Sequence, residues 1–573
     1  MKNKECIDLY TAEGEALTGQ PWNVYPRPQM RRDSFFCLNG EWSFSHNDGE
    51  RETIIVPYPP ESLLSGVHRD MGSAPKLVYE KEFELPKDFV KGRVLLHFGA
   101  VDQLAEVFLN GVKLGEHRGG YEAFSFDITE TLKDRNTLCV VATNEKDTRT
   151  LPYGKQREKR GGMWYTSVTG IWQTVWIESV SERYIRSLDI KTENNCVTVT
   201  AYGIEKGTVT VNTERGEIKA ELLCGSARVE IEEPHMWSPE DPYLYNFTVT
   251  SDTDTVSSYF ALRTLSIRNV NGIERLCLND KPYFFHGLLD QGYYSDGIYT
   301  PATPENYTRD ILEMKELGFN MLRKHIKVES ERFYYDCDRL GMIVFQDMVN
   351  NGSYSFVRDT ALPTIGVKSL SYKRLHRDEE TRKAFIDGME ATVKALKNHP
   401  CICYWTIFNE GWGQFCADDT YERMKKLDDA RFIDSTSGWF YQKKSDVDSL
   451  HVYFKPIKMP KRSNRPIVLS EFGGYSYKPE GHVYNPYNTY GYRFFKERED
   501  FENALDGLYR DEIIPAIKKG LCATVYTQVS DVEDETNGLL SYDRKVLKID
   551  KLRAQSFSAA IFEAFEEAVM GRE

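Results

Sequence analysis

Residues 397–410 read KNHPCICYWTIFNE, an apolar run of strand length that ends in Asn409 and Glu410. The run is far shorter than the roughly 20 apolar residues of a membrane span. A helical pattern at residues 377–397 precedes it, and a helix followed by an apolar run is typical of an α/β sheet. A carboxylate at the end of such a strand is costly to bury without a partner, so Glu410 indicates a site of chemistry.

The same alternation of strand and helix patterns extends through the chain from residue 275 onward. The eight expected strands are residues 284–290, 320–325, 342–347, 402–410, 432–437, 449–453, 467–471 and 523–531. Most segments between them read as helices, and a long one at residues 488–519 is expected to break near Pro515. Eight β/α alternations over roughly 300 residues predict a (β/α)8 barrel.

The residues before the barrel pattern read as strand after strand. Asn110-Gly111 lies between two short apolar runs and is a strong hairpin signal, because a type I′ turn needs positive φ at both central residues. Residues 1–181 therefore predict an antiparallel sandwich, and residues 182–268 predict a second sandwich of immunoglobulin-like size. With a barrel at residues 269–573, we expect three domains.

The composition excludes several classes of protein. The 573 residues include 73 Lys and Arg against 87 Asp and Glu, a net charge of −14, so we expect no nucleic-acid or membrane partner. No secretory signal is visible after Met1, which favours a cytoplasmic protein. The 11 Cys lack zinc-ligand spacing and read as buried thiols. The 34 Tyr, 30 Phe and 9 Trp supply flat surfaces of the kind on which sugar rings stack.

Polar residues close nearly every expected barrel strand, where the active site of this fold lies. They are Asp290, Arg323, His325, Asp347, Asn409, Glu410, Ser437, His451, Tyr453, Glu471, Gln528 and Asp531. Glu410 and Glu471 end the fourth and seventh strands, and glycoside hydrolysis uses such a pair of carboxyl groups. The alternative is that each glutamate pairs with a cation such as Arg323 in a structural ion network.

Residues 397–410 resemble the acid/base signature of glycoside hydrolase family 2, which contains β-galactosidases, β-glucuronidases and β-mannosidases. Residues 470–474 (SEFGG) resemble the nucleophile segment of that family, and residues 320–325 (NMLRKH) resemble its second-strand motif. Residues 168–176 (VTGIWQTVW) resemble the end of its N-terminal sugar-binding sandwich. The resemblance implies a jelly-roll sugar-binding domain, an immunoglobulin-like β-sandwich and a catalytic TIM barrel, in that order.

The resemblance also implies roles for individual residues. Glu410 would be the general acid/base and Glu471 the nucleophile of a retaining double displacement. Asn409 would bond the sugar 2-hydroxyl, while Arg323 and Tyr453 would keep Glu471 ionised. Further residues at strand ends or in the following loops fit a substrate pocket: His325, Asp290, His451, Trp412, Trp439, Gln528 and Asp531. Loop packing is the alternative for the two Trp, and Asp347 is expected to neutralise a neighbouring cation.

The enzyme implied is an exo-β-glycosidase that removes a non-reducing terminal sugar. β-Galactosidase is the leading expectation, and a β-uronidase (glucuronide or galacturonide) or an α-L-arabinopyranosidase is the alternative. Residues 533–538 (EDETNG) lack the Lys with which β-glucuronidases bind the sugar carboxylate, and their acidity disfavours a uronide. The basic segments 155–160 and 455–465 argue the other way if they form a rim around the site, and are otherwise solvated loops.

Two rival classes remain. An inactive carbohydrate-binding protein would be expected to lack one of the two carboxylates, yet Glu410 and Glu471 are both present. A metal-dependent hydrolase would need a His and carboxylate cluster, but no His-x-His or His-Glu-x-x-His motif occurs. We therefore expect no cofactor and no metal, and a carbohydrate as the substrate. The family resemblance also allows a homo-oligomer.

Overall fold

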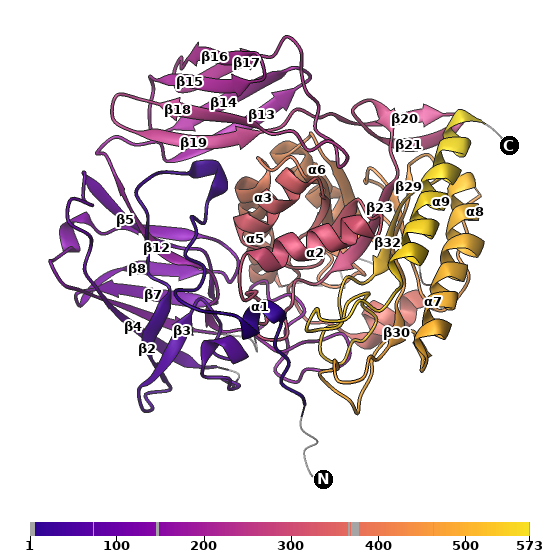
Figure 1. Cartoon of the computed structure of the whole chain (residues 1–573), viewed down its shortest axis with the longest axis horizontal. Coiled ribbons are helices and arrows are strands. Elements are labelled where there is room, and N and C mark those ends of the chain that lie inside the picture. The colour runs from indigo at the N-terminus through magenta and orange to yellow at the C-terminus, as the bar shows by residue number, and fades with distance from the viewer. Residues whose placement is uncertain are drawn as a thin grey trace.

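The computed structural model describes residues 6–72, 74–144, 148–364, 367, 378–461 and 463–571. Two β-sandwiches and a parallel barrel account for most of its strands (Figure 1). This is the fold class that the sequence predicts. No helix in the described ranges combines the length and the apolarity of a membrane span.

Two antiparallel sheets form the first sandwich, in the orders β3-β2-β4-β10-β7-β8 and β1-β12-β5-β9. Their bounds are β1 Phe36–Cys37, β2 Gly40–His46, β3 Glu52–Val56, β4 Lys76–Phe83, β5 Arg93–Phe98, β7 Leu104–Leu109, β8 Val112–Arg118, β9 Phe124–Asp127, β10 Asn136–Thr143 and β12 Val175–Val180. Between β7 and β8, Asn110 (φ +54°) and Gly111 (φ +83°) form the turn that the sequence predicts. A short ribbon pairs β6 (Val101–Asp102) with β11 (Gly170–Ile171).

The second sandwich packs a three-stranded sheet, β13-β14-β17, with a four-stranded one, β16-β15-β18-β19. Their bounds are β13 Ser187–Glu193, β14 Cys196–Tyr202, β15 Thr208–Thr213, β16 Gly216–Glu221, β17 Ser226–Glu230, β18 Tyr245–Thr250 and β19 Thr255–Phe260. Buried residues alternate along β14 and β15, which is the pattern of strands with one face on a core. A small sheet of β20 (Leu265–Val270), β21 (Ile273–Leu278) and β22 (Lys281–Pro282) connects this sandwich to the barrel.

Eight strands form the barrel sheet in the order β27-β26-β25-β24-β23-β32-β29-β28. They are β23 Phe285–Asp290, β24 Met321–Lys324, β25 Ile343–Asp347, β26 Ile402–Asn409, β27 Phe432–Ser437, β28 Asp448–Val452, β29 Ile467–Gly473 and β32 Leu521–Thr527. All of the pairings between them are parallel, and β27 contacts β28 where the sheet closes. Each of the eight strands expected from the sequence is present, with ends that differ by a few residues.

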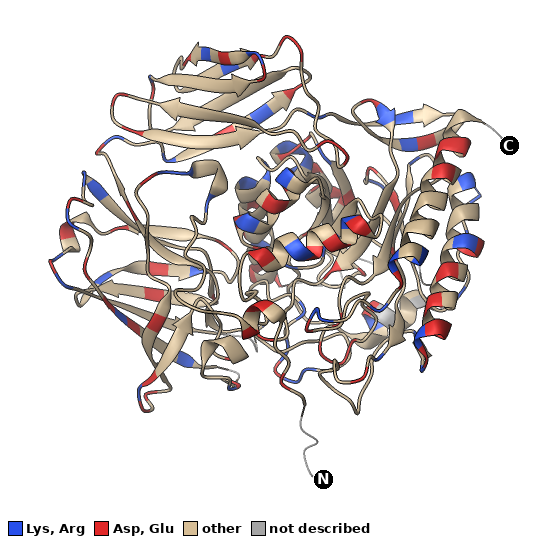
Figure 2. Cartoon of the chain, in the orientation of Figure 1, with Lys and Arg blue, Asp and Glu red and all other residues tan. Residues whose placement is uncertain are grey.

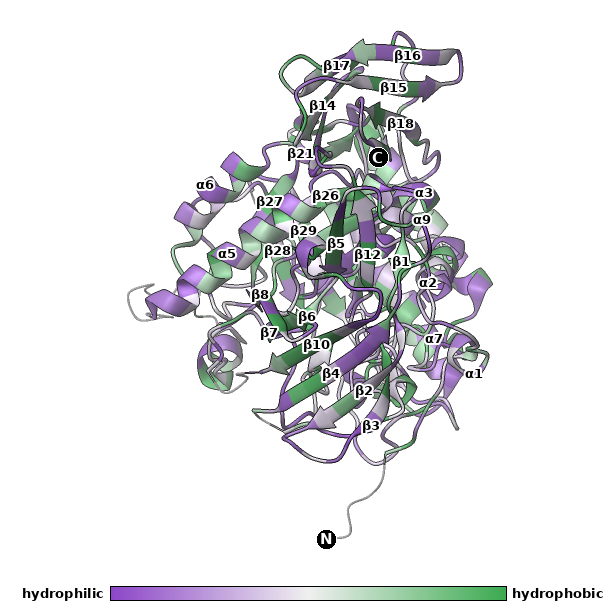
Figure 3. Ribbon diagram, turned by 90° about the vertical axis from the view of Figure 1, so that its left-hand side faces the viewer, coloured by the Kyte–Doolittle hydropathy of each residue, from purple (hydrophilic) through white to green (hydrophobic). Residues whose placement is uncertain are grey.

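Helices surround the barrel and carry its charged residues outward. They are α2 Glu305–Glu316, α3 Glu331–Leu340, α5 Glu379–Leu396, α6 Ala417–Leu427, α7 Arg498–Gly507, α8 Ile514–Lys518 and α9 Lys551–Met570, with a short α1 at Ala12–Glu15 and α4 at Leu362–Thr364. Acidic and basic residues are interspersed along α2, and α9 begins with basic residues and has its acidic residues near its end (Figure 2). Hydrophilic residues recur along α5 and α6 on the outside (Figure 3). The view thus gives no sign of a single basic face.

The long helix expected at residues 488–519 is shorter than predicted. Its first part is occupied by β31 (Arg493–Phe495), which pairs with β30 (Tyr475–Tyr477) instead. The helix begins at Arg498, passes through a π-helical segment at Leu508–Ile513 and continues as α8, with Pro515 in the first turn of α8. The break predicted near Pro515 is therefore a π-helical segment rather than a gap.

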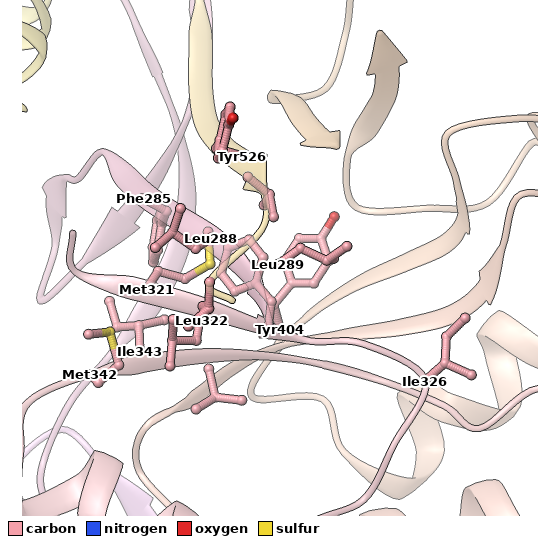
Figure 4. Close-up of a cluster of buried hydrophobic side chains, with 14 of the residues drawn as sticks. Phe285, Leu288, Leu289, Met321, Leu322, Ile326, Met342, Ile343, Tyr404 and Tyr526 are labelled. Carbon is pink, nitrogen blue, oxygen red and sulfur yellow. The ribbon is translucent and has the colours of Figure 1, made fainter. Parts of the chain in front are cut away.

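Apolar side chains fill the interior of the barrel below the polar carboxyl ends of its strands. Phe285, Leu288, Met321, Leu322 and Tyr404 are among the buried residues of this core (Figure 4). The rings of Phe345 and Tyr404, on neighbouring strands, stack at 4.1 Å. Because these residues pack tightly, the polar residues at the strand ends are attached to a rigid core.

A buried ion network ties the N-terminal segment to both sandwiches. Glu178 on β12 accepts hydrogen bonds from Arg27 (2.7 Å) and Arg32 (3.4 Å). Arg32 also bonds Asp254 of the second sandwich at 2.8 Å. Burial alone would raise the pKa of Glu178, but Arg27 and the other cations hold it down at about 2. The carboxylate is therefore charged at neutral pH and links three parts of the chain.

We predict that Glu178→Gln destabilises the protein by about 3–5 kcal/mol, because two buried guanidinium groups lose their charged partner. The matched control is Glu182→Gln, whose side chain is 71% exposed and pairs with Arg93 on the surface. That change should leave stability nearly unchanged. Urea unfolding of the three proteins at pH 7 measures the difference, and equal midpoints for the two variants would contradict the prediction.

Candidate active site

The polar ends of β24, β26, β28 and β29 meet at one end of the barrel. Arg323 is on β24, Asn409 ends β26, His451 is on β28 and Glu471 is on β29, while Glu410 follows β26 directly. Parallel strands present their carboxyl ends at the same edge, so residues far apart in the sequence converge there. The structure thus brings together seven of the predicted site residues: Arg323, His325, Asn409, Glu410, His451, Tyr453 and Glu471.

Arg323 is the centre of this arrangement and is only 1% exposed. Its Nη1 donates to Glu471 Oε1 (3.0 Å) and to the Ser470 carbonyl (2.9 Å). Its Nη2 donates to Asn409 Oδ1 and its Nε to Asp347 Oδ1, both at 2.9 Å. One guanidinium therefore fixes the ends of four strands, and Asp347 neutralises part of its charge as expected from the sequence.

Glu471 is held in its ionised form. Burial would raise its pKa, but His451 and Arg323 outweigh burial and the pKa falls to about 2. The hydroxyl of Tyr453 donates a hydrogen bond to Glu471 Oε2 at 2.5 Å, and His451 Nδ1 lies 3.6 Å from the same oxygen. A buried carboxylate that stays charged at neutral pH is suited to act as a nucleophile.

Glu410 differs from Glu471 in its backbone and its surroundings. Its φ of +51° is in the left-handed region, which is unfavourable for a residue with a side chain. The backbone N–H of Glu410 donates to the Ser437 carbonyl at 3.0 Å, which helps to hold this conformation. Its side chain is 19% exposed, against 6% for Glu471, and its Oε1 lies 2.7 Å from His451 Nδ1. Glu410 is therefore the more solvent-accessible of the two carboxyl groups.

The two carboxyl groups are close enough to act on one bond. One ligand atom from each of Glu410, His451 and Glu471 lies within 4.8 Å of the other two. Carboxyl groups about 5–5.5 Å apart are typical of retaining glycosidases, whereas inverting enzymes need about 6.5–9.5 Å. The same three groups are of metal-binding type, but the Arg323 guanidinium 3.0 Å from Glu471 opposes a divalent cation there.

His325 and Asp347 form a second buried pair beside Arg323. His325 Nδ1 lies 2.7 Å from Asp347 Oδ2. Burial lowers the pKa of His325 to about 4, so its ring is neutral at physiological pH. A neutral imidazole held by a carboxylate can orient one nitrogen toward a substrate hydroxyl.

The other predicted pocket residues occupy different surroundings. Asp290 pairs with Lys324 at 2.6 Å, and Asp531 pairs with Lys548 at 2.7 Å. Burial raises the pKa of Asp531 to about 6. Gln528 is fully buried, and within the described residues its side-chain amide has no hydrogen-bond partner. These three side chains belong to the loops and strand ends around the site, and their contact with a substrate stays a prediction.

The two tryptophans also differ from each other. Trp412 is 3% exposed and packs edge-on against Trp164 and Tyr153, with its indole N–H donating to the Gly352 carbonyl. It has the surroundings of a packed loop residue. The ring of Trp439 lies 6.3 Å from that of His451, close to the carboxyl pair.

A segment of the first domain, residues 150–166, lies against the barrel end, and only its basic residues 155–160 were expected near the site, as part of a basic rim. The Gly154 N–H donates to the Asn350 carbonyl, and a Cβ on Gly154 would be 2.9 Å from the Ile326 carbonyl. Tyr165 donates a hydrogen bond from its hydroxyl to Glu535 in the loop after β32. The segment therefore bridges the ends of β24, β25 and β32, which no local pattern in residues 150–166 reveals.

Lys155 is the residue of this segment whose charge acts on two groups at the end of the barrel, His325 and Glu535. Burial lowers the pKa of His325, and the Lys155 ammonium contributes to that decrease. Burial raises the pKa of Glu535, and Lys155 opposes that rise. Its charge therefore acts on a group at the end of β24 and on one in the loop after β32. Among the residues that the structure places, the Lys155 side chain has no hydrogen-bond or ion-pair partner.

Three arginines of the two basic segments have partners of their own. Arg160 lies 3.5 Å from both Glu533 and Asp534, and the Arg157 guanidinium lies 3.6 Å from the centre of the Trp164 ring. Arg465 pairs with Asp448 at 3.4 Å. Arg462 lies outside the described residues. Within the described residues, Lys155 is the member of the proposed basic rim whose charge acts on His325 and Glu535.

Family models of glycosidases match three consecutive parts of the chain. Residues 69–186 match the glycosyl hydrolase 2 galactose-binding domain-like model, residues 181–263 match a glycosyl hydrolases family 2 model, and residues 269–545 match the family 2 TIM barrel domain. The chain belongs to glycoside hydrolase family 2. In this family 2 protein, the matched barrel contains Arg323, Glu410 and Glu471.

Sequence relatives of this family 2 protein include proteins named β-galactosidase and proteins named β-glucuronidase. It is 23% identical to a β-galactosidase of Thermoanaerobacter pseudethanolicus over 77% of its own chain and 59% of the relative. It is also 23% identical to a β-glucuronidase of Bacteroides fragilis over 70% of its chain and 59% of the relative. The chain thus spans about 59% of the length of each of these curated relatives.

Solved structures share the whole fold at low identity. A β-D-glucuronidase of Dictyoglomus thermophilum superposes with a TM-score of 0.71 at 18% identity, covering 94% of this chain and 98% of that one. A family 2 β-galacturonidase of Eisenbergiella tayi bound to galacturonate gives 0.67 at 19% identity, covering 95% and 99%. At these identities the likeness establishes the fold.

Proposed function

We propose that the protein is a retaining exo-β-glycosidase that removes a non-reducing terminal sugar by double displacement. The observation that supports this most is the carboxyl pair. Glu471 is buried and ionised beside Arg323, and it lies within 4.8 Å of the more accessible Glu410. One group is thus charged and ready to attack, and the other is placed to give and take a proton.

In the first step, Glu471 attacks the anomeric carbon and the bond to the leaving oxygen breaks. Glu410 donates its proton to that oxygen, so the aglycone leaves as a neutral alcohol. In the second step, Glu410 takes a proton from water, the water attacks the anomeric carbon, and Glu471 is released as a carboxylate. Two inversions give net retention. Asn409, oriented by Arg323, would bond the sugar 2-hydroxyl and stabilise both transition states.

The segment of residues 150–166 supports an exo mode of action. It lies against the ends of β24 and β25 and against the loop after β32, so one side of the barrel mouth is occupied by protein. A site closed on one side accepts the end of a chain more readily than its middle. We therefore propose that a terminal sugar enters the pocket and that the aglycone stays outside.

We propose a β-galactoside as the first choice of substrate. Glu535, beside the site, accepts hydrogen bonds from Tyr165 and Asn537 but has no cation bonded to it within the described part of the chain. A sugar hydroxyl can donate to such a carboxylate, whereas a uronate carboxylate would be repelled by it. The second candidate is a β-uronide, which the Lys155 ammonium favours. The names of several relatives, among them β-glucuronidases, agree with that candidate.

We predict that a 2-deoxy-2-fluoro β-glycoside with a dinitrophenyl leaving group labels Glu471 covalently. The fluorine slows both steps, while the activated leaving group keeps the first step the faster one, so the glycosyl-enzyme accumulates. Mass spectrometry of the peptide that contains Glu471 measures the label, and the galactoside and glucuronide reagents are compared. Label on another residue, or no label with hydrolysis intact, would argue against the proposed nucleophile.

We predict that Glu410→Gln lowers kcat/KM by about 10²–10⁴-fold for a poor leaving group such as methanol. The loss should be much smaller for a dinitrophenyl glycoside, whose leaving group needs no proton. Added azide should accelerate the second step and give the β-glycosyl azide, detected by NMR. A loss that is the same for both leaving groups would exclude Glu410 as the acid.

We predict that Tyr453→Phe moves the acidic limb of the pH profile to higher pH. The Tyr453 hydroxyl bonds the ionised form of Glu471, so its removal raises the pKa of Glu471 from about 2, by about one to two units for a charge-assisted hydrogen bond. Activity then falls at a higher pH than in the wild type. The measurement is kcat/KM against pH. Tyr492→Phe, which alters the stacked neighbouring ring, is the control and should leave the limb in place.

We predict that Lys155→Met lowers kcat/KM for a β-uronide by about tenfold or more if a uronide is a substrate, since a bond to a charged group is lost. The effect on the matching β-galactoside should be smaller. The exposed Lys159 of the same segment provides the matched control, Lys159→Met. Equal losses of kcat/KM on both substrates would show that Lys155 does not determine the specificity. The neutral β-galactoside would then remain the proposed substrate.

A further inference from the structure

Most of the exposed aromatic rings of the described residues lie in the segments that follow barrel strands. Seven Phe and Tyr side chains are exposed in the described residues, and five of them follow barrel strands. These five are Phe356 after β25, Tyr441 after β27, Phe454 after β28, and Tyr487 and Phe494 after β29. Exposed apolar surface concentrated at one site indicates contact with a ligand or partner.

Phe454 is the most exposed of the five, at 76%, and it is also connected to the catalytic groups. Its ring meets that of Tyr492 edge-on at 5.1 Å. Tyr492 in turn stacks on Tyr453 at 3.7 Å, and the Tyr453 hydroxyl bonds Glu471. A ladder of three rings thus leads from the nucleophile to the surface.

The ladder stands on the same side of the site as the proposed proton donor. Tyr492 is close enough to Glu410 for the carboxylate to act on its hydroxyl. Trp439 lies beside His451, whose Nδ1 is 2.7 Å from Glu410. A proton donor contacts the oxygen that joins the sugar to its aglycone. The side of the site on which Tyr492 and Trp439 lie near Glu410 and its partner His451 is therefore where an aglycone would extend.

We propose that Phe454 and Tyr492 form an aglycone platform for a flat, apolar group, such as the ring of an aromatic alcohol. This inference rests on the proposed glycosidase function. Rings stacked or edge-on to an aromatic face gain specific stabilisation beyond burial alone. The ladder offers such a face directly beside the leaving oxygen, whereas the sugar itself is bound by the charged residues below.

The test compares substrates that share one sugar and differ in the aglycone. These are a 4-nitrophenyl β-glycoside, a β-linked disaccharide and the glycosyl fluoride, which has no ring to stack. For Phe454→Ala, the ratio of kcat/KM for the aryl glycoside to that for the fluoride should fall about two- to tenfold. Phe454→Tyr should restore the ratio. Leu223→Ala, a 77% exposed residue of the second sandwich, is the control for loss of exposed apolar surface.

The outcomes separate this inference from the proposed function. If the wild type hydrolyses none of these substrates with any sugar tested, the glycosidase proposal itself fails. If it does hydrolyse them and Phe454→Ala leaves the ratio unchanged, the platform is wrong. If Phe454→Ala lowers kcat/KM for the disaccharide as much as for the aryl glycoside, the Phe454 ring contacts a second sugar. The proposed preference for an aromatic aglycone is then wrong. If the variant changes the mass of the particle in light scattering and leaves the ratio unchanged, Phe454 belongs to a subunit interface instead.

Discussion

The site depends on one buried guanidinium. Arg323 is almost fully removed from water, and a charge in that position is costly unless its donors are satisfied. Asp347, Glu471, Asn409 and the Ser470 carbonyl satisfy them, and these groups belong to three other strands. The cost of burying the charge is thus offset only when the ends of β24, β25, β26 and β29 are in register. The same contacts keep Glu471 ionised and orient the Asn409 amide beside it.

This constraint explains why the two carboxyl groups behave differently. Glu471 is bonded by Arg323 and Tyr453 and is nearly inaccessible. Glu410 lies beyond the end of β26 in a left-handed conformation, and its Oε1 lies 2.7 Å from His451 Nδ1. A strained turn at this point moves its carboxyl group out of reach of Arg323 and toward solvent. Two glutamates on one barrel edge therefore have two environments, which is what an attacking group and a proton donor require.

The barrel and its central residues could be predicted because their signals are local. An apolar run that ends in a polar residue marks a buried strand and its catalytic end, and this holds for Glu471 and for Arg323 as well as for Asn409. Lys155 and Tyr492 have no such signal. Gly154 packs on the Ile326 carbonyl, and the Tyr492 N–H donates to the Gly474 carbonyl, so both residues reach the site through contacts distant in sequence. The start of the helix near residue 498 was missed for the same reason, since β31 is paired with a distant strand.

Two of the groups from which we argue the choice of sugar are not placed by the barrel strands. Glu535 comes from the loop after β32 and Lys155 from the first domain, and their opposite charges act on the same mouth. A neutral sugar leaves the two charges to offset each other, with Glu535 free to accept a hydroxyl. The carboxylate of a uronate would pair with the Lys155 ammonium. Glu535 would then be buried beside a second carboxylate. Burial raises the pKa of Glu535 while Lys155 opposes that rise, so a proton on Glu535 is the change that would remove this repulsion. The charges of Glu535 and Lys155 therefore favour different substrates, the first a neutral sugar and the second a uronide.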